Sequence, residues 1–200
     1  LNVLHQEPGA QNLQHLENLE TLSGGSSTIT QDPSSQQLEY IENLYNHESK
    51  QSLLTLIGKM LAKFPNSSVL YNIIGIINAD LEQYQDAVEN YQSAINIKPD
   101  YADAYNNMAN ALKNLNKLKD AILAYEKALN IKPDCAEIYY NMGGALKELG
   151  KLEEAINAFD SATSLKPNYI EAYNNKANAL REQGRLDAAL EIYGKLLHLK

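Results

Sequence analysis

The chain has little cysteine and little positive charge. Its single cysteine, Cys135, cannot form an internal disulfide, and no Cys/His spacing suits zinc, so we expect neither a disulfide-stapled secreted scaffold nor a metal site. Lys and Arg number 17 against 25 Asp and Glu, and a chain with the resulting net charge of −8 lacks the positive surface that phosphate neutralisation requires. We therefore expect no nucleic-acid partner, and the reducing cytoplasm is the default location.

Long apolar runs are also missing. The longest strongly apolar run, Ile73 to Ile77, is far below the roughly 18–20 residues of a membrane-spanning helix, so we expect no membrane span. Residues 1–10 contain no Lys or Arg, whereas a secretory signal begins with basic residues. The absence of an initiating methionine suggests a processed chain or an excerpt from a longer one.

What the chain does have is an internal repeat of 34 residues. Prolines recur at this interval, and aromatic and alanine positions between them keep the same phase, so chance does not explain the pattern. The members of the series are Pro65, Pro99, Pro133 and Pro167; Tyr71, Tyr105, Tyr139 and Tyr173; Ala87, Ala121, Ala155 and Ala189; and Tyr91, Tyr125, Phe159 and Tyr193.

Each unit has the pattern of two helices. In residues 102–135, apolar side chains follow helical spacing on both sides of an interruption at 114–117. Asn116, Gly150 and Gly184 lie at this interruption and tolerate the left-handed conformation that ends a helix. The first unit has Glu82 there, which predicts a strained or differently capped turn. A Lys-Pro pair then stops the second helix.

Small residues mark the place where the two helices of a unit cross. Gly75, Ala109, Gly143 and Ala177 lie in the middle of the first helix, and the Ala87 series lies near the start of the second, so the helix axes must approach closely. A single hairpin cannot bury both of its faces. Neighbouring units are therefore expected to stack into a curved solenoid.

A 34-residue helix-turn-helix unit with these residues at fixed offsets resembles the tetratricopeptide repeat. The resemblance covers Ser68 to Lys200. It implies an all-α, right-handed superhelical solenoid of antiparallel helix-turn-helix repeats, whose first helices line a concave groove that binds a protein or peptide. Two positions depart from the pattern, because Asn78 replaces a leucine of the other units and Lys176 replaces an isoleucine or methionine.

The phase of the repeat also predicts the organisation of the chain. Residues 1–36 have linker composition and are expected to be poorly ordered, although Leu13, Leu16 and Leu19 are spaced as in a short helix. Residues 37–67 are expected to form a divergent helix pair that caps the array. Four repeats follow, over residues 68–101, 102–135, 136–169 and 170–200, and the last stops one residue before the expected proline.

Asparagines form the one constellation that suggests a binding site. Asn107, Asn141 and Asn175 recur at 34 residues on the first helices, at a local cost in helix propensity. A regular row of amides can bind the backbone of an extended peptide. The row resembles the asparagine ladder in the repeat domain of O-linked N-acetylglucosamine transferase. The other candidates for the concave groove are Asn72, Asn106, Asn110, Asn174 and Asn178. The alternative interpretation is a common family residue that caps or bridges neighbouring helices.

Charged residues add two candidate edges to the groove. Asp103, Glu137 and Glu171 recur near the start of the first helix, and Lys113, Lys147 and Arg181 recur near its end. Both rows are also compatible with simple solvation. The family's clamp for a terminal carboxylate is not matched, since Asn72, Glu137 and Asn141 stand at three of its positions, and this disfavours chaperone-tail binding.

No catalytic constellation is visible. The four histidines are scattered, and no glycine loop suits a phosphate, so we expect no enzyme and no cofactor. The favoured hypothesis is a scaffold or adaptor that binds a polypeptide segment along the concave face. One alternative is the substrate-recognition arm of a larger glycosyltransferase or sulfotransferase that follows Lys200. A second is self-assembly through the solenoid ends, because the last unit is expected to expose Ala188, Leu190 and Tyr193.

Overall fold

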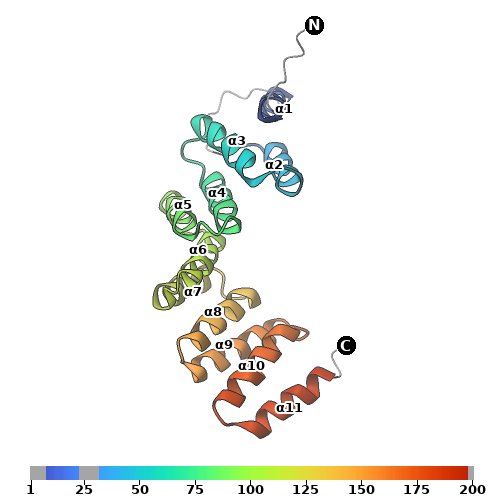
Figure 1. Ribbon diagram of the computed structural model, residues 1–200, viewed down its shortest axis with the longest axis vertical. Coiled ribbons are helices and arrows are strands. Elements are labelled where there is room, and N and C mark those ends of the chain that lie inside the picture. The colour runs from blue at the N-terminus through green and yellow to red at the C-terminus, as the bar shows by residue number, and fades with distance from the viewer. Residues whose placement is uncertain (1–7, 23–31, 198–200) are drawn as a thin grey trace. The chain divides into compact units, whose positions relative to one another are not determined.

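The computed structural model describes residues 8–22 and 32–197, and all regular structure in these two ranges is helical (Figure 1). The helices are α1 (Pro8–Leu22), α2 (Ser35–His47), α3 (Lys50–Lys63), α4 (Ser68–Asp80), α5 (Tyr84–Ile97), α6 (Ala102–Asn114), α7 (Leu118–Ile131), α8 (Ala136–Glu148), α9 (Leu152–Leu165), α10 (Ile170–Glu182) and α11 (Leu186–Leu197). They fall into two compact units, residues 1–98 and 99–200. None of the described helices is long and apolar enough to cross a membrane.

The helices follow the predicted period. The first helices α4, α6, α8 and α10 each contain 13 residues and start at positions 34 apart, and the second helices α5, α7 and α9 each contain 14. Within the C-terminal unit, each first helix packs against its own second helix, and α7 and α9 also pack against the first helix of the next repeat. The all-α repeat fold predicted from the sequence is therefore confirmed.

The four turns inside the repeats are built alike. In each, the residue after the helix cap adopts positive φ: 59° at Glu82, 58° at Asn116, and 80° at Gly150 and Gly184. The following N–H donates to the carbonyl five residues back, as from Lys151 to Leu146 at 2.9 Å, which is the Schellman arrangement. The first repeat makes the same bond from Gln83 to Asn78 at 2.8 Å. The alternative of a different cap for Glu82 is wrong, and the left-handed backbone there agrees with the predicted strain.

This turn leads to a stability prediction. We expect Glu82→Gly to stabilise the chain by about 0.5–1 kcal/mol, because a side chain at positive φ costs roughly 1–2 kcal/mol and part of the relief is offset by glycine's greater freedom in the unfolded chain. Thermal unfolding followed by circular dichroism measures the change. Asn116→Gly is the control and should gain less, since Asn tolerates this conformation. An equal or lower melting temperature for Glu82→Gly would contradict the prediction.

Two kinds of helix crossing occur in the repeats. A Cβ atom added at Gly75 would lie 2.5 Å from Cε1 of Tyr91, and one added at Gly143 would lie 2.6 Å from Cε1 of Phe159, so an aromatic ring rests directly on the glycine backbone. The other two repeats have Ala109 and Ala177 at this position. A ring cannot approach an alanine Cβ so closely, so the aromatic side chain must be placed differently there.

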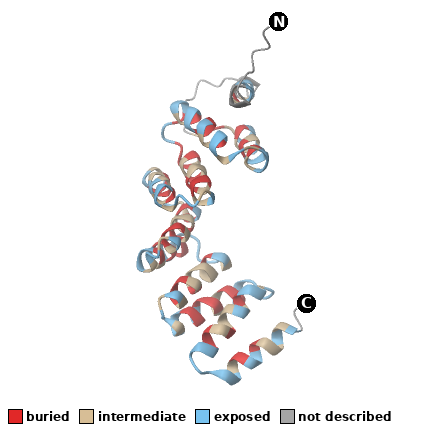
Figure 2. Ribbon diagram, viewed as in Figure 1, coloured by how far each residue is buried: buried red, intermediate tan, exposed pale blue. Residues whose placement is uncertain are grey.

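The interior of the C-terminal unit is narrow and rich in alanine. Tyr125 and Phe159 are fully buried between helices, and Ala121, Ala155 and Ala128 allow the helices to approach. Figure 2 shows buried stretches along the helices of this unit. Phe159 packs in a cluster with Leu146, Ala155 and Ala158, and the partly buried Ile122, Tyr140 and Met142 close it. Because Ile122 lies on α7, this cluster joins two successive repeats.

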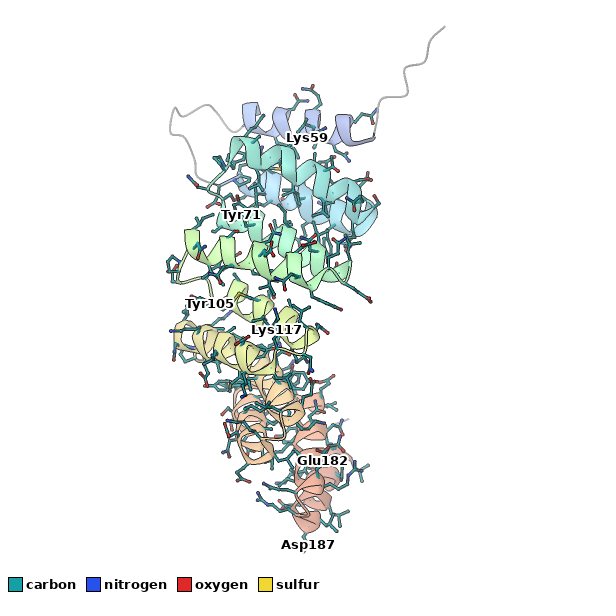
Figure 3. The ribbon with its side chains drawn as sticks, turned by 60° about the vertical axis from the view of Figure 1, so that its left-hand side comes forward. Lys59, Tyr71, Tyr105, Lys117, Glu182 and Asp187 are labelled. Atoms are coloured by element: carbon teal, nitrogen blue, oxygen red, sulfur yellow. The ribbon has the colours of Figure 1, made fainter. Side chains whose placement is uncertain are left out.

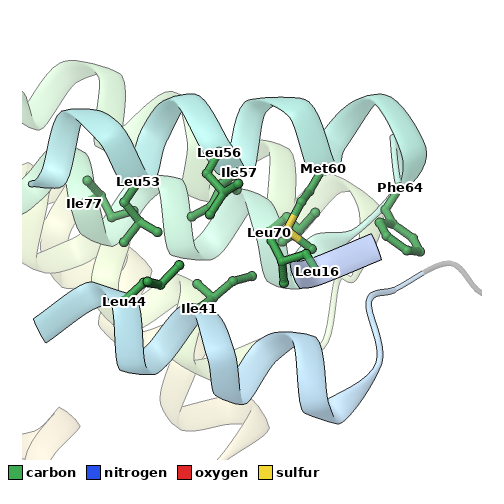
Figure 4. Packing of buried hydrophobic residues seen from close by; sticks show 10 residues of the cluster. All are labelled: Leu16, Ile41, Leu44, Leu53, Leu56, Ile57, Met60, Phe64, Leu70 and Ile77. Carbon is green, nitrogen blue, oxygen red and sulfur yellow. The ribbon is translucent and has the colours of Figure 1, made fainter. Parts of the chain in front are cut away.

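The N-terminal unit has a more aliphatic core. Figure 4 shows Ile41 and Leu44 of α2 directed toward α3, with Leu70 and Ile77 of α4 completing the cluster. At the positions where the repeats place Gly or Ala, the α2–α3 pair carries Ile41 and Leu53. These larger side chains keep the two helices from the close crossing seen in a repeat.

A helix occupies part of the segment that was expected to be poorly ordered. Residues 8–22 form α1, whereas 1–7 and 23–31 lie outside the described residues, and the poor order of residues 1–36 stays a prediction. Leu16, with 2% of its surface exposed, packs into the aliphatic core, and Gln37 Nε2 donates to its carbonyl at 3.0 Å. Tyr40 OH also donates to Asn12 Oδ1 at 2.8 Å. The spacing of three leucines thus marked a helix that docks on α2 and α3.

Candidate peptide-binding face

Asn107, Asn141 and Asn175 lie at equivalent positions on α6, α8 and α10, and each is half-buried. Asn141 Nδ2 donates to Asn106 Oδ1 at 3.3 Å, and Asn175 Nδ2 donates to the hydroxyl of Tyr140 at 3.1 Å. Both bonds run from one first helix to the preceding first helix. Asn141 and Asn175 therefore bridge neighbouring repeats, which is the role that the alternative interpretation of the sequence gave to this row.

Bridging does not exhaust the hydrogen-bonding capacity of these side chains. A carboxamide has two N–H donors and an oxygen with two lone pairs, and each of these bonds uses one N–H. The bond also restrains the side-chain torsions, so less conformational entropy is lost when a ligand binds. We define Asn107, Asn141 and Asn175 as the amide row.

Asn110 and Asn178 accept hydrogen bonds inside their own repeats, and their predicted place in the groove stays a prediction. Tyr125 OH donates to Asn110 Oδ1, and Tyr193 OH donates to Asn178 Oδ1 at 2.9 Å, in each case from the second helix of the same repeat. Burial raises the pKa of Tyr125 well above its usual range, and the charge of Glu148 adds to the effect, so the hydroxyl stays a donor. Each of these hydrogen bonds joins the two helices of one repeat.

The sequence contained a signal for this bond. The repeat with Phe159, which has no hydroxyl, carries Gly144 where the repeats with Tyr125 and Tyr193 carry Asn110 and Asn178.

The remaining predicted asparagines differ in exposure. Asn72 and Asn106 are buried, with 6% and 9% of their surface exposed, and offer little area to a ligand, whereas Asn174 is exposed.

The predicted basic edge contains two ion pairs between repeats. Lys113 Nζ lies 3.9 Å from Glu148 Oε1, and Lys147 Nζ lies 3.9 Å from Glu182 Oε1, so each lysine reaches the next first helix. Figure 3 shows Glu182 near the turn that leads into α11. Arg181 is exposed on α10. Surface pairs at such distances contribute little to stability, and they leave the lysines accessible to a ligand carboxylate.

Aromatic side chains fill the joint between the third and fourth repeats. The rings of Tyr140 and Tyr169 lie 5.0 Å apart between centroids, and the ring of Phe159 lies 6.1 Å from that of Tyr140. Burial raises the pKa of Tyr169 to about 12, with smaller contributions from Tyr140 and nearby carboxylates. This packing fixes the Tyr140 hydroxyl that accepts the bond from Asn175.

The last helix exposes a stripe of leucines. Leu186, Leu190 and Leu197 on α11 are 57%, 66% and 74% exposed. In the preceding repeat, the equivalents Leu152 and Ile156 pack in a cluster with residues of α10. Of the residues expected to be exposed here, Leu190 is exposed, but Ala188 and Tyr193 are half-buried and pack against the cluster of α10 and α11, so the expectation is wrong for these two. Self-association through this surface stays a prediction.

Stacked helical hairpins that carry a regular row of side chains define a repeat-type interaction scaffold. A profile described as the TPR repeat matches residues 77–116, 109–150 and 143–180, and a second tetratricopeptide repeat profile matches residues 170–200. The chain belongs to the tetratricopeptide repeat family. No curated protein sequence matches it.

Solved structures share the fold at low sequence identity. A crystal structure of MamA has a TM-score of 0.75 at 23% identity, covering 80% of this chain and 93% of that one. MamA from Desulfovibrio magneticus RS-1 gives 0.75 at 22% identity, over 80% and 91% of the two chains. YrrB, described as a TPR protein with an unusual peptide-binding site, gives 0.70 at 18% identity, over 97% and 93%. These likenesses concern the fold.

Proposed function

We propose that this chain is a non-enzymatic scaffold or adaptor that binds an extended polypeptide segment across the amide row. The observation that carries the proposal is the pair of bonds that fix Asn141 and Asn175 at equivalent places on consecutive first helices. A peptide backbone presents donors and acceptors at regular intervals, and a row of carboxamides can bind it without selecting particular side chains. The lysines next to the row supply attraction for an acidic segment.

The experiment is an affinity capture from a lysate of the source cell, followed by titration of one recovered partner. The variant Asn141→Ala, Asn175→Ala removes two contacts and is expected to weaken binding about tenfold or more, since each hydrogen bond contributes about 0.5–1.5 kcal/mol. The matched control is Asn130→Ala, Asn157→Ala, which removes two exposed asparagines from the second helices α7 and α9. Circular dichroism checks that both variants retain their helix.

Partners lost by the first variant and kept by the control would support the proposal. Recovery of the same partners, with unchanged affinity, by both variants would contradict it, and the two side chains would then serve only as bridges between repeats. The resemblance to the asparagine ladder, the role as a transferase arm and the cytoplasmic location stay predictions.

A further inference from the structure

An apolar pocket lies between α2 and α4 in the N-terminal unit. It has a volume of about 570 Å³, within the range of roughly 300–1,000 Å³ that is typical of ligand pockets. Its apolar wall consists of Leu38, Ile41, Tyr45, Val69, Ile73 and Ile76. All of these except Ile41 are half-buried, so the wall is accessible to a ligand.

In the first repeat, an isoleucine of the pocket stands at the position that the amide row occupies in the later repeats. Ile73 and Ile76 stand 34 residues before Asn107 and Asn110, so the first repeat offers two isoleucines where the second offers two amides. Asn72, the neighbouring amide, is buried. Recognition at this surface must therefore depend on burial of apolar side chains rather than on hydrogen bonds to a peptide backbone.

One edge of the pocket is acidic. Glu39 and Glu42 lie one helical turn apart on α2, both are exposed, and neither carboxylate forms an ion pair with the rest of the described chain. Two neighbouring carboxylates repel each other, and a bound cation relieves that repulsion. The nearby cation is already engaged, because Lys50 Nζ lies 3.4 Å from Asp80 Oδ2 and 3.0 Å from the centre of the Tyr45 ring.

Two residues of the apolar wall, Tyr45 and Ile41, are held in place by their neighbours. Tyr45 OH donates to Asp80 Oδ2, and burial together with this bond raises the pKa of Tyr45 to about 12. Ile41 belongs to the aliphatic core, so the floor of the pocket is fixed by the packing of α2 on α3. A preformed apolar wall binds with little loss of conformational entropy.

We propose that this pocket binds the bulky apolar side chains of a basic, amphipathic segment in a partner protein, with Lys or Arg residues of that segment paired to Glu39 and Glu42. The apolar wall selects leucine-like or aromatic side chains. The acidic edge selects the flanking cations, and the net charge of −8 favours their approach. The site lies in a different unit from the amide row and does not depend on it.

The test measures binding of a fluorescent amphipathic peptide of leucine and lysine to the full chain by fluorescence anisotropy. Two further peptides replace its leucines by alanine or its lysines by glutamate. We expect the affinity to fall about tenfold or more with either change. In the protein, Ile73→Asn introduces the residue that the other three repeats carry at this position, so the fold should tolerate it, and it is expected to reduce affinity by a similar factor.

A second variant, Glu39→Gln, Glu42→Gln, changes only exposed side chains and keeps the test valid if Ile73→Asn fails to fold. It should weaken binding and reduce its dependence on salt. Asn130→Ala, Asn157→Ala, which changes only exposed asparagines of α7 and α9, should leave the affinity unchanged. Loss of binding in Asn141→Ala, Asn175→Ala but not in the pocket variants would place the peptide on the amide row and overturn the proposal. Unchanged affinity in both pocket variants, or equal binding of the glutamate peptide, would overturn the proposal. So would a doubling of the solution mass that blocks peptide binding, because a second copy would then occupy the pocket.

Discussion

Replacing Phe159 by alanine is expected to lower the free energy of unfolding by about 3–5 kcal/mol, the typical loss for a fully buried aromatic ring. The ring contacts α8 through Gly143 and lies in the cluster that Ile122 of α7 helps to close. Its removal therefore leaves a cavity at the joint between two repeats. In a repeat array the stability depends on such nearest-neighbour interfaces, so the substitution should destabilise the neighbouring repeat as well as its own.

Urea unfolding followed by circular dichroism measures this change, and the slope of the transition reports whether the array still unfolds as one unit. Leu123→Ala is the matched control, because Leu123 is 60% exposed on the second helix of the preceding repeat, and it should change stability by less than about 1 kcal/mol. Equal losses in the two variants would show that the ring does not organise the joint.

Much of the fold follows from spacing alone. The Lys-Pro pairs mark the ends of the second helices in the first three repeats, because proline stops a helix, and the turn residues mark the ends of the first helices, because the left-handed turn ends the helix before it. The docking of α1 could not be predicted in this way. It depends on Leu16 finding a place in a core formed by α2, α3 and α4, and on the bond from Gln37 to a carbonyl 21 residues away.

The candidate site was less predictable, since one residue type serves three purposes. Asn141 bridges two first helices, Asn110 accepts a bond from Tyr125, and Asn174 is exposed. Periodicity locates all three on helices but does not give the direction of a side chain or its partner. In the second, third and fourth repeats, the co-occurrence of tyrosine with asparagine, and of Phe159 with Gly144, carries that information in the sequence, whereas the first repeat combines Tyr91 with Ile76.

Gly143 and Gly144 are neighbours in α8 with opposite surroundings, so the same substitution is expected to act differently at each. An added Cβ would lie 2.6 Å from Cε1 of the buried Phe159 ring at Gly143, but 4.0 Å from the flexible tip of Lys113 at Gly144. Each alanine gains about 1 kcal/mol of helix propensity. At Gly143, displacement of the ring costs about 1–3 kcal/mol. Urea unfolding should therefore show a higher free energy of unfolding for Gly144→Ala than for the unchanged chain. The free energy of unfolding of Gly143→Ala should be about 1–3 kcal/mol lower than that of Gly144→Ala.

The other repeats supply the control for this pair. In the second and fourth repeats an alanine coexists with a tyrosine, whose hydroxyl is bonded to Asn110 or Asn178. The combination Gly143→Ala, Gly144→Asn, Phe159→Tyr rebuilds that arrangement in the third repeat, so its stability should exceed the sum of the single changes. Simple additivity would mean that the ring position is not set by these three residues. A Gly143→Ala variant as stable as Gly144→Ala would show that α9 shifts freely, and the glycine would then have no packing role.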